Sequence, residues 1–146
     1  MFKRILLPVD GSIDSKKALD YVTDIAIKFN SEVIVIYVYQ VSDPLFSTSG
    51  KLKSMVFTSG FENSLNDKFN SLLEEYRKKL EAAGIKFKIM VEKGKPDTEI
   101  LKVLAEEKCD LVVMGNRGLD SPSDGLLGNI SYSVVHHTDC PLLLAK

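Results

Sequence analysis

The chain has 146 residues, of which 45% are hydrophobic and 27% are charged, and its formal net charge is -1. This composition predicts one ordinary globular domain over residues 1–146, and the near-neutral charge excludes the basic footprint of a nucleic-acid-binding protein. No apolar run reaches the length of a membrane span and no signal peptide precedes the first strand, so we expect a cytoplasmic protein.

The first forty residues alternate between strand and helix patterns. Residues 5–9 form a short apolar run, which predicts a buried strand that ends at the turn residues 10–12. Ser12 is suited to the N-cap of a helix that runs to residue 29 with apolar side chains on one face. Residues 33–38 are apolar and rich in β-branched side chains, as expected of a strand covered on both faces.

The middle of the chain is less regular. From Gln40 to Gly60 the pattern disappears, so we expect a structureless loop, which is either a lid over a ligand or an insertion. Apolar residues at helical spacing then predict a helix from Phe61 to a stop at Gly84. Phe87, Ile89 and Val91 place apolar side chains at every second position, which indicates a more exposed strand near an edge of the sheet.

Four further elements complete the pattern. Pro96 opens a helix with a buried face at residues 100–104, and residues 111–114 form a fourth strand. A helix over residues 126–137 is expected to turn four apolar side chains inward, those of Leu127, Ile130, Val134 and Val135. Residues 142–144 form a fifth strand. Strands that alternate with helices specify an α/β fold, here an open five-stranded parallel sheet with helices on both faces.

A glycine-bounded loop follows the fourth strand. Gly115 ends the apolar run, Gly118 comes after two residues, and Gly128 precedes the next helix. Glycine permits positive φ angles and lets a ligand approach where a Cβ would obstruct it. A helix that begins beside such a loop presents free N–H groups and a partial positive charge. This arrangement suits a phosphate chain.

Three predicted strands end in candidate residues. Asp10 follows the first strand, Val38 lies at the end of the second, and Gly115 follows the fourth. In a parallel sheet, ligands bind at the carboxyl ends of the strands, beside the point where the strand order reverses. We therefore expect these strand ends to converge on one ligand site.

These residues resemble the universal stress protein family over essentially the whole chain. The family's strand-Pro-x-Asp-Gly-Ser opening matches at residues 8–12, and its nucleotide signature, Gly-x2-Gly-x9-Gly-Ser/Thr, matches at Gly115, Gly118 and Gly128. Cys140-Pro141 before the last strand also looks like the family. The resemblance implies a Rossmann-like fold of the adenine nucleotide α-hydrolase type, with the five predicted strands in the order 3-2-1-4-5.

The same resemblance implies an ATP site, with or without Mg²⁺. Asp10 and the main chain of Val38 would contact the adenine, and Gly115 would lie against the ribose. Backbone N–H groups and side-chain donors after the second and third glycines would hold the phosphates. The implied binding residues are Pro8, Asp10, Val38, Met114, Gly115, Arg117, Gly118, Gly128, Asn129, Ile130 and Ser131. No catalytic residue is assigned.

One position departs from the family's signature, because Asn129 stands where the family has Ser or Thr. Its amide can donate to a phosphate oxygen, so retained binding is favoured, although a hydroxyl is the better partner for Mg²⁺. The function that follows is an ATP-binding, nucleotide-dependent regulatory switch in the stress response. Two alternatives stay open: a slow ATPase or autophosphorylating protein, and a family member that has lost nucleotide binding and acts by protein interaction.

The apolar last strand bears on the partners of the chain. An edge strand as apolar as residues 142–144 needs to be covered, which predicts a homodimer through this strand, as is common in the family. A partner protein of unknown identity is also expected, whereas nucleic acid and membrane are not.

The cysteines and histidines give weaker evidence, for a disulfide and for a metal site. Cys109 and Cys140 each precede a strand, and two reduced thiols are favoured over a disulfide between neighbouring strands. His136 and His137 are adjacent on a helix and so point in different directions, which favours a role as charge at the helix end over a metal site.

Overall fold

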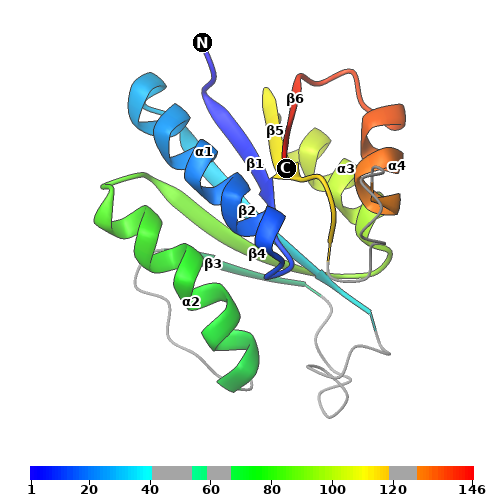
Figure 1. Cartoon of the computed structure of the whole chain (residues 1–146), viewed down its shortest axis with the longest axis horizontal. Coiled ribbons are helices and arrows are strands. Elements are labelled where there is room, and N and C mark those ends of the chain that lie inside the picture. The colour runs from blue at the N-terminus through cyan, green and yellow to red at the C-terminus, as the bar shows by residue number, and fades with distance from the viewer. Residues whose placement is uncertain (41–53, 59–66, 119–127) are drawn as a thin grey trace.

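A computed structural model describes residues 1–40, 54–58, 67–118 and 128–146 (Figure 1). Within these ranges the chain forms one sheet with helices packed against it. The strands are β1 (Arg4–Pro8), β2 (Glu32–Tyr39), β3 (Ser54–Thr58), β4 (Phe87–Lys93), β5 (Leu111–Gly115) and β6 (Leu142–Ala145). The helices are α1 (Ile13–Phe29), α2 (Asp67–Ala82), α3 (Pro96–Glu106) and α4 (Asn129–His137).

The sheet has the order β3-β4-β2-β1-β5-β6. All neighbours from β4 to β6 are parallel, and these strands are the predicted ones in the predicted order 3-2-1-4-5. β1 is central, because the chain passes from β1 to β2 on one side and later returns to β5 on the other. The strand order therefore reverses between β1 and β5, which confirms the predicted switch point.

Helices cover both faces of the sheet (Figure 1). β2 shows how one strand serves both faces, since alternate side chains point in opposite directions. Val33 and Val35 pack in the apolar cluster that includes residues of α1 and α2. Ile34 and Ile36 pack in a second cluster with residues of α3 and α4. Burial on both faces explains why the strand is an unbroken apolar run.

The expected loop from residue 40 to 60 is wrong in part, because β3 lies within it. β3 pairs antiparallel with β4, with Met55 opposite Val91 and Phe57 opposite Ile89. It satisfies backbone groups that β4 would otherwise leave unpaired at a sheet edge. Five residues among serines and threonines are too short a pattern to stand out in the sequence. The lid hypothesis concerns residues 41–53 and 59–60, which lie outside the described residues.

The predicted exposure of β4 is wrong, although the strand does lie near the edge of the sheet, next to β3. Ile89 is 2% exposed and Val91 is fully buried, because both pack in the apolar cluster that includes residues of α1 and α2. The alternating polar positions have specific environments: the Lys88 ammonium lies 2.7 Å from a carboxylate oxygen of Glu107, and Glu92 is itself buried. A polar side chain in an alternating pattern therefore does not mark an exposed face here.

The ends of α1 and α3 agree with their predicted signals. Ser12 is the N-cap of α1, where its hydroxyl accepts from the Ser15 N–H at 3.2 Å. Asn30 ends α1 in the left-handed region, with φ of 54°. Pro96 begins α3. For the helix expected from Phe61, the described part begins at Asp67, and residues 61–66 lie outside the described residues.

The predicted orientation of α4 is wrong at two positions. Val134 is fully buried as expected, but Ile130 and Val135 are 40% and 41% exposed. The side chain that faces inward at the start of the helix is that of Ser131, three residues before Val134 and on the same face. Leu127 lies outside the described residues. The inward face of α4 is therefore partly polar, and this matters for the site below.

Candidate functional site

Two loops meet at the switch point of the sheet. The β1 turn, residues 9–12, leads from β1 into α1, and the glycine loop, residues 115–118, follows β5. Asp10 shapes the first of them: its Oδ1 accepts from the Ser12 N–H at 2.8 Å, and its own N–H donates to Ser15 Oγ at 3.3 Å. Asp10 therefore has the turn-forming role that aspartate commonly plays.

Asp10 also contacts the glycine loop. A Cβ placed on Gly118 would lie 2.5 Å from Asp10 Oδ2, which is closer than any real Cβ contact. One carboxylate oxygen thus organises the β1 turn, while the other lies against the glycine loop. The structure brings together two of the predicted site residues, and the absence of a side chain at position 118 allows it.

Asp14 is a further link between the loops, and sequence reasoning missed it. Its carboxylate is buried, with Oδ2 accepting from the Arg117 N–H at 3.1 Å and lying 3.9 Å from Arg117 Nε. Ser12 Oγ donates to the Arg117 carbonyl at 3.3 Å. In the sequence Asp14 looks like an ordinary acidic residue in the first turn of a helix. Only the tertiary contact reveals that it holds the glycine loop.

Gly115 is a glycine for a steric reason. A Cβ at this position would lie 2.8 Å from the Ser15 nitrogen and 2.9 Å from the Asp14 carbonyl carbon, both in the backbone of α1. Among the described glycines, positive φ angles occur at Gly11, Gly84 and Gly94, whereas Gly128 has φ of -63°. Close approach thus explains Gly115 and Gly118, and none of the three signature glycines has a positive φ.

Two groups expected to face a phosphate instead fasten α4 to β5. The Gly128 N–H donates to the Asn116 carbonyl at 2.9 Å. Ser131 Oγ donates to the carbonyls of Gly115 and Asn116, at 2.8 and 3.0 Å. Because a hydroxyl has one proton, Ser131 has none left to donate to a ligand in this arrangement.

The start of α4 retains other donors. The first hydrogen bond of the helix runs from the Tyr132 N–H to the Gly128 carbonyl at 2.8 Å. The N–H groups of residues 129–131 precede this bond, so they have no acceptor within the helix. Asn129 is exposed, so its amide can reach a ligand at the same end. An anion at this point would also be favoured by the helix dipole.

The remaining predicted residues lie at or near the carboxyl ends of β1, β2 and β5. Pro8 is buried at the end of β1, and Met114 is 5% exposed in the cluster beneath α3 and α4. Val38 is half-buried near the end of β2, opposite Glu92 of β4. Burial and the charge of Glu92 raise the pKa of the nearby Tyr39 hydroxyl. Sequence reasoning did not anticipate that Glu92 is buried.

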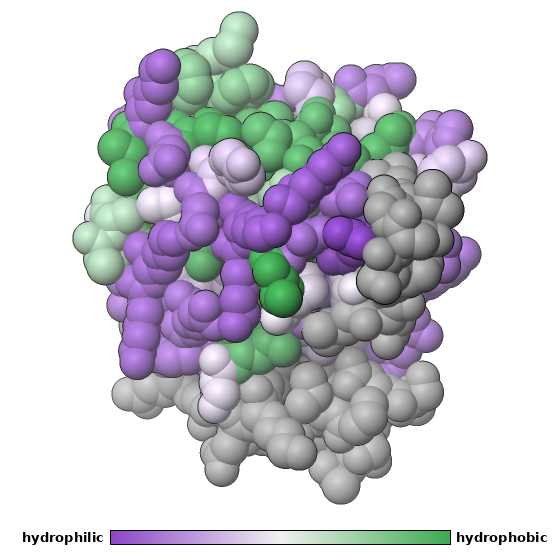
Figure 2. Space-filling view, in the orientation of Figure 1, coloured by the Kyte–Doolittle hydropathy of each residue, from purple (hydrophilic) through white to green (hydrophobic). Residues whose placement is uncertain are grey.

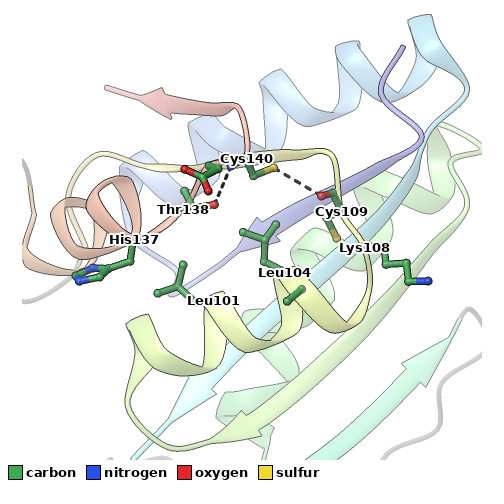
Figure 3. A pocket seen from close by; sticks show the side chains of 9 residues that line it. Leu101, Leu104, Lys108, Cys109, His137, Thr138 and Cys140 are labelled. Atoms are coloured by element: carbon green, nitrogen blue, oxygen red, sulfur yellow. Dashed lines mark hydrogen bonds between the residues drawn. The ribbon is translucent and has the colours of Figure 1, made fainter.

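A separate cavity of about 340 Å³ lies at the opposite end of the strands, where β5 and β6 begin (Figure 3). Both cysteines line it, and Cys140 Sγ donates to the Cys109 carbonyl at 3.6 Å. Both thiols are free, as favoured from the sequence. Burial raises the pKa of Cys109 to about 12 and also raises that of Cys140. The described residues contain no group of three or more histidines, cysteines and carboxylates placed to hold a metal ion.

The fold is that of an α/β protein, with the β1 turn and the glycine loop side by side at the switch point of a parallel sheet. Residues 1–146 match the model of the universal stress protein family. The chain therefore belongs to the universal stress protein family. No helix in the described part of the chain has the length and apolar character needed to cross a membrane.

Three similar proteins illustrate the relationship. A universal stress protein of Methanothermobacter thermautotrophicus is 31% identical over 149 residues, which cover 100% of this chain and 97% of the relative. The solved structure of protein MJ0577, from Methanocaldococcus jannaschii, is 29% identical with a TM-score of 0.75, and covers 100% of this chain and 96% of its own. A universal stress protein in complex with cAMP is 23% identical with a TM-score of 0.71, and the match covers 99% of this chain and 97% of that one.

Proposed function

We propose that the chain binds ATP at the edge formed by the β1 turn, the glycine loop and the start of α4, and acts as a nucleotide-dependent regulatory switch. The observation that carries the proposal is the contact between Asp10 and Gly118, which joins the predicted base and phosphate regions into one site. Asp10 and Val38 would contact the adenine, with Pro8 and Met114 beneath it. The cAMP complex of a protein with the same fold supports an adenine nucleotide as the ligand class.

The phosphates have a narrower set of donors than the signature suggests. We assign them to the N–H groups of residues 129–131, the Asn129 amide and the Arg117 guanidinium. Arg117 is held near Asp14 at 3.9 Å, and an anion would compete with this weak ion pair. Because the backbone donors do not depend on the Asn129 side chain, Asn129→Ser is expected to change the affinity by less than about threefold.

Nucleotide retention and calorimetry test the proposal. Purified protein is heated, and the small molecules released are separated by chromatography. ATP is then titrated into protein freed of nucleotide, with and without Mg²⁺. Release of ATP or ADP, or a calorimetric response to added ATP, is the expected result. If neither occurs, the chain is a family member that acts by protein interaction alone.

A switch is favoured over catalysis because the described residues offer a poor nucleophile. The Ser131 hydroxyl, the candidate nearest the start of α4, donates to two backbone carbonyls and is buried. Phosphoryl transfer requires an aligned nucleophile and stabilisation of the developing charge. Incubation with γ-labelled ATP separates the two functions: intact bound ATP supports a switch, whereas release or transfer of the label supports catalysis.

We also propose that the protein is a homodimer through β6. Leu142, Leu143 and Leu144 are only partly buried, and Tyr132 on the adjacent α4 is 55% exposed. Figure 2 shows hydrophobic residues gathered across the part of the surface where β6 lies in Figure 1. β6 is also an edge strand, so half of its backbone groups point away from β5. A second copy of β6 would satisfy these groups and cover the leucines.

A proline at a β6 residue whose backbone N–H points away from β5 tests the dimer. The carbonyls of Pro141 and Ala145 accept from β5, so the even-numbered residues between them direct their backbone groups outward. Leu144→Pro removes one outward N–H without breaking the ladder to β5. In analytical ultracentrifugation at micromolar concentration we expect a dimer for the parent chain and a monomer for the variant. A monomeric parent chain would refute the proposed interface.

A further inference from the structure

Tyr76 of α2 lies directly beneath the β1 turn. Its side chain is fully buried, and its hydroxyl is 2.8 Å from Ser15 Oγ. Tyr76 therefore makes a polar contact between α2 and the first turn of α1, directly after the β1 turn, inside an otherwise apolar cluster.

The contact belongs to a short chain of hydrogen bonds that ends at Asp10. Ser15 Oγ, the neighbour of the tyrosine hydroxyl, accepts the Asp10 N–H at 3.3 Å. The Asp10 carboxylate in turn accepts the Ser12 N–H at 2.8 Å. The backbone and the side chain of Asp10 are thus both held by groups that Tyr76 contacts or that lie within the same turn.

α2 also supports the turn through an apolar contact. Gly11 has φ of 82°, and a Cβ placed there would lie 3.0 Å from Leu72 Cδ1. Leu72 and Tyr76 are four residues apart on α2, so they lie on the same face of the helix. One face of α2 therefore supports the β1 turn in two ways: Leu72 packs against Gly11, and the Tyr76 hydroxyl bonds Ser15, which accepts the Asp10 N–H.

Removal of the hydroxyl would loosen the turn without emptying the core. Burial raises the pKa of Tyr76, so its hydroxyl is neutral and protonated over the physiological range. Without it, the buried Ser15 hydroxyl loses a partner, and the turn that Ser15 holds through the Asp10 N–H relaxes to recover the hydrogen bond. The aromatic ring, which fills the apolar cluster, stays in the Tyr76→Phe variant.

We propose that Tyr76 is a positioning residue of the nucleotide site: through Ser15 its hydroxyl fixes the turn that presents Asp10 to the ligand. This inference rests on the proposed nucleotide-binding function. It makes α2, which supplies none of the predicted site residues, part of the support of the site.

The test compares ATP affinity in the full-length chain and in Tyr76→Phe. By titration calorimetry, at a temperature where both proteins are folded, we expect the variant to bind ATP roughly five- to tenfold more weakly. Ile89→Val is the matched control. It removes one methyl group from the same apolar cluster, and isoleucine has no hydroxyl that could hold the turn. This control should bind ATP as the parent chain does.

A double-mutant cycle separates positioning from general loosening of the core. In an Asp10→Ala background the side chain to be positioned is absent, so Tyr76→Phe should weaken binding by less than about twofold. Without nucleotide, amide exchange at Asp10 should be faster in Tyr76→Phe and unchanged in Ile89→Val.

The outcomes distinguish two failures. Equal ATP affinity of the parent chain and Tyr76→Phe overturns the inference and leaves the proposed function intact. The inference is also overturned if Tyr76→Phe weakens ATP binding equally in the parent chain and in the Asp10→Ala background. If the parent chain binds no ATP, the proposed function fails and the inference falls with it.

Discussion

Asp10 Oδ2 occupies the position that a side chain on residue 118 would need, since a Cβ there would lie 2.5 Å from this oxygen. The obstruction is the end of a flexible side chain, so a larger residue at 118 can be accommodated if Asp10 moves. A Cβ on Gly115 would instead meet the backbone of α1, which cannot move alone. The first and second glycines of the signature therefore have different consequences when replaced.

Gly118→Ala is expected to impair binding more than stability. The new methyl group displaces the Asp10 carboxylate, which we expect to lower ATP affinity about tenfold and the free energy of unfolding by about 1 kcal/mol or less. Titration calorimetry and urea denaturation measure the two effects. Gly118→Val should abolish binding with the fold intact. Unchanged affinity in both variants would show that the position of Asp10 does not matter to the ligand.

Gly115→Ala is expected to destabilise the fold itself. The first turn of α1 must shift to accept a Cβ, and overpacking of this kind costs about 1–3 kcal/mol. Gly84→Ala is the matched control: no atom lies within 4 Å of a Cβ there, but φ is 67°, so the cost is about 1 kcal/mol of backbone strain far from either loop. Urea denaturation should rank Gly115→Ala as the less stable variant. The reverse order would contradict the tight packing of α1 on β5.

The sequence predicts those parts of the fold that depend on local pattern. Strands such as β2, with apolar side chains on both faces, and helix ends such as Ser12 and Asn30 are recognisable because neighbouring residues determine them. β3 is not, because five residues acquire strand structure by pairing with β4. The exposure of β4 was misjudged because alternation along a strand does not reveal that the face with Ile89 and Val91 packs in the cluster with α1 and α2.

The candidate site also combines residues that local pattern predicts with residues that only tertiary contacts reveal. The strand ends at Asp10 and Gly115 follow from the order of the elements, and the structure places them at the switch point. The role of Asp14 depends on a hydrogen bond to Arg117, 103 residues away in the chain, which no local pattern contains. Ser131 was assigned to the phosphates by the family resemblance, and no local pattern shows that its hydroxyl is buried and donates to the Gly115 carbonyl at the end of β5.

Ser133 and Asp97 are expected to make stability depend on pH. Ser133 Oγ donates to Asp97 Oδ2 at 2.7 Å, and this hydrogen bond holds the pKa of Asp97 below its usual value of 3.8. A carboxylate with a lowered folded-state pKa stabilises the fold above its unfolded-state pKa, and this contribution is lost as the pH falls through the folded-state value. Ser133→Ala should therefore lower the free energy of unfolding by about 1 kcal/mol at neutral pH.

Urea denaturation of the two proteins across pH measures this difference. The difference in free energy of unfolding between the parent chain and Ser133→Ala should narrow as the pH falls below 3.8. In an Asp97→Asn background, Ser133→Ala should show no such pH dependence, because the titrating group is gone. If the difference in free energy of unfolding stays constant down to the lowest pH at which both proteins fold, the role of the Asp97 carboxylate is contradicted.

The two cysteines are expected to resist alkylation in the native protein, Cys109 more than Cys140. Burial raises the pKa of Cys109 to about 12, and Cys140 Sγ is a donor to the Cys109 carbonyl, which requires a protonated thiol. Since the thiolate is the reactive form, the reactive fraction of Cys109 at pH 8.5 is roughly a thousandfold below that of a free cysteine. Iodoacetamide treatment, digestion and mass spectrometry of the two peptides give the rates. In denaturant both cysteines should react quickly and equally. Fast native labelling of Cys109 would contradict its burial, whereas a mass increase of the untreated protein on reduction would show that the thiols had formed a disulfide.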